Sequence, residues 1–209
     1  MSVLGISTLR NVNNDSSIST IIVPENGYIS INPPLTRRRI GSHSTRTTHP
    51  HFLNRLESLL KDAGFHVKFV NPYQYKTKGE MLAECVDQNA IEKAIPLSVS
   101  CSHWHREHLQ CGHCVPCIIR RASVHHANFT VDAPYKTKRL KKLIKEKETR
   151  DDLQALSTAI IRQNKTGNYK SWLRQSGPLP QDVTIRSQLE LTIERGLKEV
   201  DTFLKSEKN

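Results

Sequence analysis

The residues best suited to chemistry are four cysteines that lie close together, Cys101, Cys111, Cys114 and Cys117. Zinc takes four soft or borderline ligands at tetrahedral positions, and a Cys-x2-Cys turn presents two thiolates from one bend. Two such turns overlap here, Gly112 gives the backbone freedom to form the first, and Cys101 completes the set. Four cysteines leave no open coordination position for water. The spacing therefore predicts a structural zinc site.

Three other uses of these cysteines remain open: an iron-sulfur cluster, thiol redox chemistry, and coordination in which a histidine replaces one thiolate. The fifth cysteine, Cys85, falls on the apolar side of an expected helix, where a small buried hydrophobe is more common than a fifth ligand. The histidines that could replace a thiolate lie in the same loop and are His103, His105, His108 and His113. The alternative is that their side chains are solvated and bind no metal.

The segments before the cysteines predict part of an α/β layer. Residues Ile18–Val23 are typical of a short buried strand and Tyr28–Ile31 of a second short extended piece, each ended by turn residues. Apolar residues then recur at helical spacing from Phe52 to Ala63, with Pro50 near the first turn and Gly64 as a stop. Residues 65–70 are expected to form the next strand. An incomplete α/β layer over residues 1–95 follows.

Helices are expected around this layer and after it. Residues Lys78–Val86 and Ala90–Ile95 predict two short helices, and a cysteine-rich segment occupies residues 96–133. From residue 134 the composition is charged and helical, with amphipathic helices expected at Leu153–Ile161 and Ile185–Leu204. We therefore expect a basic helical tail over residues 134–209. No feature of the tail indicates a catalytic or binding site. We expect the tail to pack on a missing half of the protein or on a partner.

The charge of the chain favours polyanionic partners. Thirty-one Lys and Arg against twenty Asp and Glu give a net charge of +11. The residues from Lys136 to Lys147 are rich in Lys and Arg, although such a run is more often a solvated helix face. Aromatic residues make up only 6% of the chain, and no aromatic ladder interleaves with the basic run. Nucleic acid is thus a weakly supported partner.

The sequence also indicates a compartment. It contains no apolar run of about 18 residues and no cleavable leader pattern at its start, so we expect no membrane association. Clustered cysteines fit a metal site in a reducing compartment better than a disulfide framework. Both observations predict a cytoplasmic protein.

The run from Asn71 to Arg120 resembles the C-terminal part of the QueC family, the 7-cyano-7-deazaguanine synthases. The likeness lies in Thr77, Lys78 and Glu80 at the start of a helix, in the Ser-x-Ser-Cys segment that ends at Cys101, and in a Cys-Gly-x-Cys-x-x-Cys-x-x-Arg segment. The stretch PENGYISINPPLTRRRIGSHSTRTTHPHFL is similar to QueC-like proteins of anti-phage systems such as Qat. The resemblance covers about residues 20–130.

The resemblance implies the C-terminal part of a Rossmann-like PP-loop ATP pyrophosphatase fold with a zinc-binding loop. The family, which acts in queuosine biosynthesis, uses ATP to activate a 7-deazaguanine carboxylate as an acyl-adenylate, which ammonia then attacks. By likeness, the four cysteines would bind zinc, and Lys78 and Glu80 would be catalytic. Lys78 would stabilise phosphate or oxyanion charge. For Glu80, an acid that complements a helix dipole is the alternative.

One departure from the family changes the expectation. Family members open with a Ser-Gly-Gly-x-Asp-Ser loop whose backbone N–H groups hold phosphate, and the present sequence has no such segment. ATP would therefore bind only with an N-terminal half supplied by another chain, such as a protein encoded in the same operon. We expect a fragment, a split subunit or a truncated form.

Candidate substrate-binding residues come from the polar loop over residues 36–49. They are proposed from residue type alone, since cations can bind the phosphates or the carboxylate and histidines can bind a base or an acid group. A solvated loop is the alternative. The candidates are Arg37, Arg38, Arg46, His43 and His49.

Two functions of different classes follow. The first is the zinc-binding portion of a QueC-like, ATP-dependent 7-deazaguanine carboxylate ligase in anti-phage defence; whether this chain is itself an enzyme stays open because of the absent loop. The alternative is a zinc-ribbon-like module that binds nucleic acid or a partner without catalysis. A degenerate subunit with a purely structural role is a third possibility.

Overall fold

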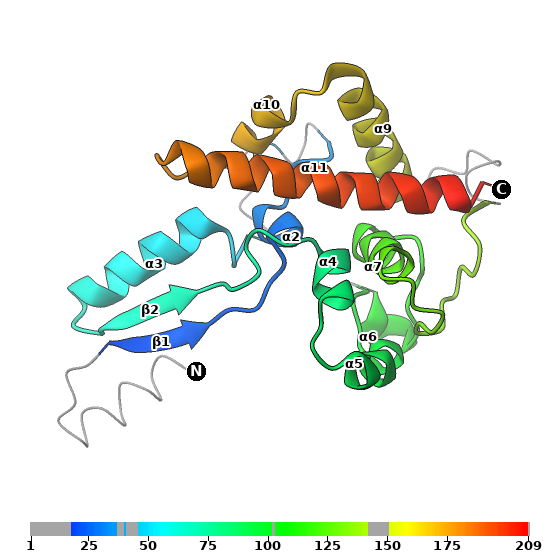
Figure 1. The fold of residues 1–209 in the computed structure, drawn as a ribbon, viewed down its shortest axis with the longest axis horizontal. Helices are drawn as coiled ribbons and strands as arrows, with labels where there is room; N and C mark the ends of the chain where they lie inside the picture. The colour runs from blue at the N-terminus through cyan, green and yellow to red at the C-terminus, as the bar shows by residue number, and fades with distance from the viewer. Residues whose placement is uncertain (1–17, 37–39, 41–45, 102, 142–150, 209) are drawn as a thin grey trace.

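The computed structural model describes residues 18–36, 40, 46–101, 103–141 and 151–208. The fold is mixed α/β and mostly helical, with a small parallel sheet of two strands (Figure 1). In chain order the elements are β1 (Ser19–Ile22), α2 (Gly27–Ile31), α3 (Pro50–Asp62), β2 (Val67–Val70), α4 (Lys78–Ala83), α5 (Gln88–Ala94), the 3-10 helix η2 (Ile95–Leu97), α6 (Trp104–Glu107), α7 (Val115–His126), α9 (Asp151–Thr166), α10 (Tyr169–Arg174) and α11 (Val183–Ser206).

The sheet pairs β1 with β2 in parallel, in a register that runs from Ser19 opposite Val67 to Ile22 opposite Val70. Helix α3 connects the strands and packs beside β2, where the Glu57 carboxylate accepts a hydrogen bond from the Phe69 backbone N–H. Both predicted strands are confirmed. The prediction that the first is buried is wrong, because Ile22 is 66% exposed on a sheet that α3 covers from one side.

Helix α3 follows its sequence pattern. Its N-cap is His49, whose side chain accepts a hydrogen bond from the His51 N–H, and Pro50 occupies the first turn. Beyond its end, Gly64 has a φ of +84°, a left-handed conformation that glycine adopts without steric cost. The predicted helix is confirmed between these two signals.

The second extended piece, predicted at Tyr28–Ile31, is wrong, since these residues lie in helix α2. The Asn26 side chain accepts a hydrogen bond from the Ile29 N–H and so caps the helix. Asn32 ends it in the left-handed conformation. The short apolar run was compatible with either structure, and the two asparagines decide it.

Helix α4 ends before the predicted boundary at Val86. The Gln88 side-chain amide donates hydrogen bonds to the carbonyls of Leu82, Ala83 and Cys85 at the end of the helix. Asp87 then caps α5. Cys85 therefore lies after the helix and is partly exposed, so the expected buried hydrophobe is not observed there.

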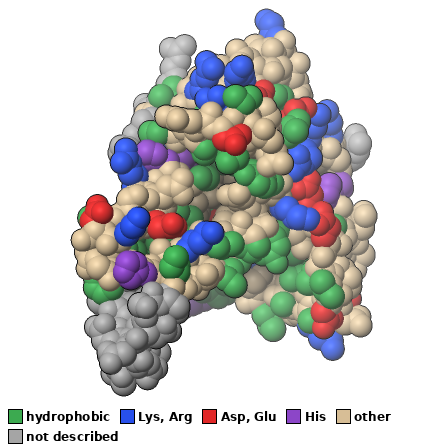
Figure 2. All heavy atoms as spheres, turned by 60° about the vertical axis from the view of Figure 1, so that its left-hand side comes forward, with side chains coloured by type: hydrophobic (Ala, Val, Ile, Leu, Met, Phe, Trp, Pro, Cys, Tyr) green, Lys and Arg blue, Asp and Glu red, His purple; other side chains and the backbone are tan. Residues whose placement is uncertain are grey.

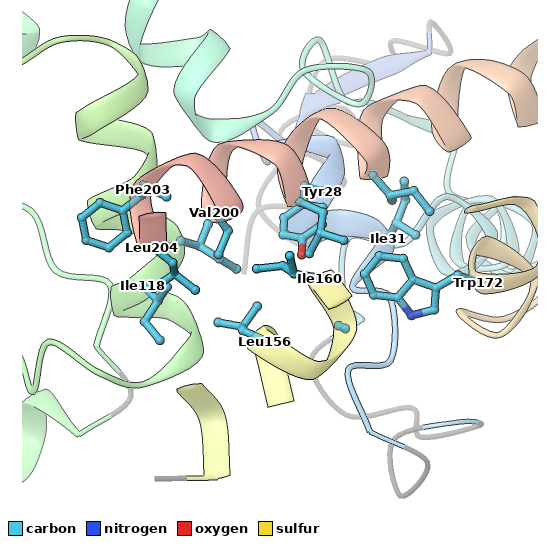
Figure 3. Close-up of a cluster of buried hydrophobic side chains, with 14 of the residues drawn as sticks. Tyr28, Ile31, Ile118, Leu156, Ile160, Trp172, Val200, Phe203 and Leu204 are labelled. Atoms are coloured by element: carbon cyan, nitrogen blue, oxygen red, sulfur yellow. The ribbon is translucent and has the colours of Figure 1, made fainter. Parts of the chain in front are cut away.

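Helix α11 organises the main core. Its buried stripe includes Leu189, Ile193, Leu197 and Val200, and it packs on α7, α2, α9 and α10. Figure 3 shows core side chains from α2, α7, α9 and α10 converging beneath α11. The Trp172 indole N–H also donates a hydrogen bond to the carbonyl of Pro34. The helical tail thus packs within the chain and builds its core.

Helix α11 approaches α2 closely at one glycine. A Cβ at Gly196 would lie 2.6 Å from Cγ of Tyr28, so only glycine allows this contact without displacement. Two short helices, α6 and α10, were not predicted. No helix in the described ranges combines the length and apolar character that a membrane span requires.

Candidate metal centre and adjoining cavity

The four predicted cysteines form one buried cluster. Their sulfur atoms all lie within 4.8 Å of one another, and each residue is at most 6% exposed. The Cys111 and Cys117 sulfurs are 3.9 Å apart, and those of Cys114 and Cys101 are 4.0 Å apart. The cluster could therefore hold a metal ion.

The sulfur spacing suits a single ion. Four thiolates at about 2.3 Å from a tetrahedral zinc ion lie about 3.8 Å from each other. The two closest observed separations, 3.9 and 4.0 Å, are near this value. In a four-iron cluster each cysteine binds a different iron atom, and in a two-iron cluster the four cysteines are divided between two irons, so both require a wider arrangement. A mononuclear site fits the geometry better.

The first Cys-x2-Cys turn has the backbone that the sequence predicted. Gly112 has a φ of +84°, and a Cβ there would lie 2.6 Å from the carbonyl oxygen of Thr137. The turn therefore requires glycine for both its conformation and its packing. It places the Cys114 N–H 3.3 Å from the Cys111 sulfur, where it donates a hydrogen bond.

The protein supplies partial positive charge around the sulfurs. Cys114 is the N-cap of α7 and Cys117 lies in its first turn, so the positive end of the helix dipole adjoins the cluster. The backbone N–H groups of His103 and Cys111 donate to the Cys101 sulfur. These features favour thiolates.

Without a cation, however, the cluster favours thiols. Burial raises the pKa of the Cys111 thiol to about 11. The hydrogen bond with the Cys114 sulfur, followed by burial, raises the pKa of the Cys117 thiol. Four thiolates at this distance need a compensating positive charge, which a divalent ion provides.

Arg121 holds the cysteine loop against the core. Its guanidinium donates hydrogen bonds to the carbonyls of Gly112 and Lys138, pairs with Glu207 at 3.3 Å, and lies over the Tyr135 ring. Tyr135 in turn packs on the cysteine cluster. Loop, α7 and α11 are thus joined at one buried arginine, which the sequence did not single out.

The neighbouring candidates do not join the cluster. Among the described residues, the group of potential metal ligands contains the four cysteines and no histidine. His113 instead contacts the Cys111 carbonyl through Nδ1, and His108 packs its ring against Trp104. Cys85 contacts the Asp87 carbonyl, outside the cluster.

The Thr77, Lys78 and Glu80 segment opens α4 through a capping box, in which Thr77 and Glu80 exchange side-chain to backbone hydrogen bonds. Arg195 of α11 pairs with Glu80 at 2.5 Å. Burial would raise the pKa of Glu80, but the hydrogen bond from Arg195 lowers it overall. These contacts fit a helix-capping acid, and the catalytic role expected of Glu80 stays a prediction.

The start of α4 is also anchored to α11 by a buried acid. The Glu199 carboxylate accepts hydrogen bonds from the Thr77 hydroxyl and from the Gly79 N–H. A Cβ at Gly79 would lie 2.8 Å from this carboxyl group, so glycine permits the approach. Lys78 is therefore presented from a rigid helix start.

Lys78 lies between the cysteine segment and a large cavity. Its Nζ donates a hydrogen bond to the Ser100 hydroxyl at 3.2 Å, next to Cys101 in the chain. Burial, followed by the charge of Arg120, lowers the pKa of Lys78, while the Glu25 carboxylate acts in the opposite direction. Lys78 is thus a partly buried amine with an acid nearby.

The cavity has a volume of about 1140 Å³ and brings together segments far apart in the sequence. Glu25 and Lys78 line it together with Asp152 and Arg162 of α9, and its apolar lining includes Ile119 of α7. A mixed lining of this kind suits a small organic molecule with polar groups. No motif identified Glu25, Asp152 or Arg162 as site residues, because only the fold brings them near Lys78.

The cysteine segment forms one wall of this cavity. Ser100 precedes the first cysteine, and Val115 and Pro116 follow Cys114 directly. The Asp152 carboxylate accepts a hydrogen bond from the Val115 N–H and so links α9 to the start of α7. A metal ion in the cluster would therefore fix the position of the cavity wall.

The polar-loop candidates are placed only in part. Arg37, Arg38 and His43 lie outside the described residues. His49 is buried at the start of α3, and Arg46 lies one turn before it; the structure brings these two together near Gly177 and places neither in the lining of the Lys78 cavity. Their roles in substrate binding stay predictions.

The structure describes the basic run from Lys136 to Lys141, and residues 142–147 lie outside the described part of the chain. On the face shown in Figure 2, Lys and Arg side chains are interspersed with acidic and apolar ones. No continuous basic patch is visible on that face among the coloured residues. Nucleic-acid binding stays a prediction, and the face shown adds no feature in its favour.

Comparisons of the chain with protein-family models, with curated proteins and with solved structures found no match. The likeness to the QueC family therefore rests on the motifs quoted above.

Proposed function

We propose that the chain is the zinc-stabilised, substrate-binding portion of a QueC-like ligase, and that its cavity binds a 7-deazaguanine carboxylate. The observation that carries the proposal is the position of Lys78, whose amine lines a cavity of about 1140 Å³ beside the cysteine cluster. Zinc is the proposed ion, and its role is to hold the cavity wall.

The charges of the cavity support this substrate class. Lys78 and the Ser100 hydroxyl can bind a carboxylate together. Glu25 and Asp152 offer carboxylate acceptors for the N–H groups of a heterocycle, and Ile119 offers an apolar surface for its ring. A planar molecule with one acidic group and several N–H donors complements this lining.

ATP would be bound by a PP-loop protein that packs on this chain. Parallel sheets are normally covered on both faces. The two-stranded sheet leaves Ile22 66% and Val70 36% exposed, and Ile18 beside it is 67% exposed. These apolar side chains form the proposed contact surface for a further α/β layer.

The direct test is calorimetric titration of the zinc-loaded chain with 7-carboxy-7-deazaguanine and with 7-deazaguanine, which lacks the carboxylate. The acid should bind more tightly. Lys78→Gln should weaken its binding about tenfold to a hundredfold, because a charge-assisted hydrogen bond is lost. Lys76→Gln is the matched control, since Lys76 pairs with Glu84 on the surface.

Equal affinity for the two compounds, or unchanged binding by the Lys78 variant, would contradict the proposed site. The ligase activity requires a second assay, in which AMP formation from ATP is followed with a PP-loop protein encoded beside this chain. AMP that appears only with both proteins and the acid supports the ligase. If the chain binds the acid tightly but no AMP forms with any such protein, the result would support a binding module and contradict the ligase.

A further inference from the structure

A second polar site lies away from the Lys78 cavity, where the start of α3 meets the segment after α10. A Cβ built on Gly177 would lie 3.5 Å from Nη1 of Arg46 and 3.9 Å from both Nε2 and Cε1 of His49. The guanidinium and the imidazole edge therefore face a common point above the glycine backbone. Gly177 has a φ of +131°, which side-chain-bearing residues rarely adopt.

His49 directs a hydrogen-bond donor toward this point. Its Nδ1 accepts a hydrogen bond from the His51 N–H at 3.2 Å, so the proton of the neutral ring is on Nε2. Burial, followed by the charge of Arg46, lowers the pKa of His49 to about 4, and the ring is neutral at pH 7. His49 is 4% exposed, and its Nε2 has no hydrogen-bond partner in the described part of the chain.

A second buried donor lies next to the glycine. Ser176 is fully buried, and its hydroxyl likewise has no hydrogen-bond partner among the residues that the structure describes. Buried polar groups are nearly always hydrogen-bonded, and the described residues supply no acceptor for the imidazole N–H or for the hydroxyl.

The electrostatic setting selects an anion. His49 is the N-cap of α3, a helix of 13 residues with no acidic residue in its first turn. The positive end of the helix dipole and the Arg46 guanidinium therefore act together. The loop that carries them is fixed to α2, because the Ser30 hydroxyl donates a hydrogen bond to the Thr48 carbonyl.

We propose that Arg46, His49 and the backbone around Gly177 form a binding site for a phosphate group. Arginine matches the oxygen geometry of phosphate, and helix N-termini bind phosphate repeatedly in proteins. The phosphate can be inorganic or carried by a nucleotide. The site is separate from the Lys78 cavity and does not depend on the proposed ligase function.

The test is calorimetric titration of the full chain with inorganic phosphate and, in a second series, with AMP. Arg46→Gln should weaken phosphate binding about tenfold or more. His49→Asn should also weaken it; asparagine is a good N-cap, so this variant keeps the helix start and removes the imidazole donor. Arg174→Gln removes an exposed arginine nearby and should bind like the wild type.

Lys78→Gln distinguishes the two cationic sites, because phosphate binding that is lost in this variant and kept in Arg46→Gln would belong to the cavity and would overturn the proposal. Tighter binding of AMP than of phosphate would assign the site to a nucleotide, and equal binding would assign it to free phosphate; both results support the site. No phosphate binding, or binding that neither Arg46→Gln nor His49→Asn weakens, would overturn the proposal.

Discussion

Replacement of one sulfur ligand tests whether the metal holds the fold together. Cys117 is 0% exposed in the first turn of α7, and its sulfur lies 3.9 Å from that of Cys111. In Cys117→Ser a hydroxyl replaces the thiolate. Serine is a weak zinc ligand that stays protonated, so the variant should lose both the ion and the charge balance of the remaining cysteines.

The expected loss follows from ligand-linked stability. An ion present at about a thousand times its dissociation constant stabilises the folded state by about 4 kcal/mol. For a chain of this size, 1 kcal/mol shifts the melting temperature by about 2–4 °C. The near-tetrahedral sulfur spacing means that little rearrangement opposes binding. We therefore predict a fall of about 8–16 °C.

The assay is thermal unfolding followed by circular dichroism, with zinc present and again after chelation. Cys85→Ser is the matched control, since Cys85 is partly exposed and lies outside the cluster. Wild type and control should fall together on chelation, while Cys117→Ser should start low and respond little. A melting temperature that neither chelation nor the Cys117 change lowers would refute a structural metal.

Three further changes test other contacts. Lys78→Met should be more stable than the wild type at pH 7, since burial lowers the Lys78 pKa and the charged amine therefore opposes folding. This cost falls as the pH rises from the lowered pKa toward the ordinary pKa of lysine, so the difference between the melting temperatures should be smaller at pH 10 than at pH 7. A less stable variant at pH 7 would contradict this reasoning. Arg120→Met should cost about 3–5 kcal/mol in urea unfolding, because the buried guanidinium pairs with Asp132 at 2.8 Å and also donates to the carbonyls of Ile95 and Ser98. A cost under about 1 kcal/mol would be the opposing result. Gly196→Ala should lower the unfolding free energy by about 1–2 kcal/mol, since overpacking against Tyr28 outweighs the gain in helix propensity, and a stabilised variant would show that the helices can separate at no cost.

Local signals allowed correct prediction where the determining residues are close in the sequence. The cysteine cluster follows from the spacing of its ligands and from Gly112, and α3 follows from Pro50, its apolar period and Gly64. Each of these features is decided within a few residues.

Prediction failed where a side chain outside the pattern decided the structure. The caps at Asn26 and Asn32 convert an apolar run into α2, and the Gln88 amide ends α4 early. The cavity was out of reach for a different reason. Glu25, Lys78 and Asp152 meet only because α2, α4 and α9 pack around α7 and α11, which no local motif specifies.

The two polar sites also differ in what the sequence could indicate. Arg46 and His49 were candidates from residue type alone, and the structure places them together. Their common neighbour is Gly177, which lies far from both in the sequence. Long-range partners of this kind require the fold.

The central claim is that four thiolates bind one zinc ion, and X-ray absorption at the zinc edge tests it most directly. One zinc per chain with four sulfur neighbours at about 2.3 Å is the predicted result. A spectrum with nitrogen neighbours would mean that a histidine replaces one of the cysteines. A protein that purifies with iron and shows iron-iron scattering, or one with no bound metal, would contradict the single-ion site.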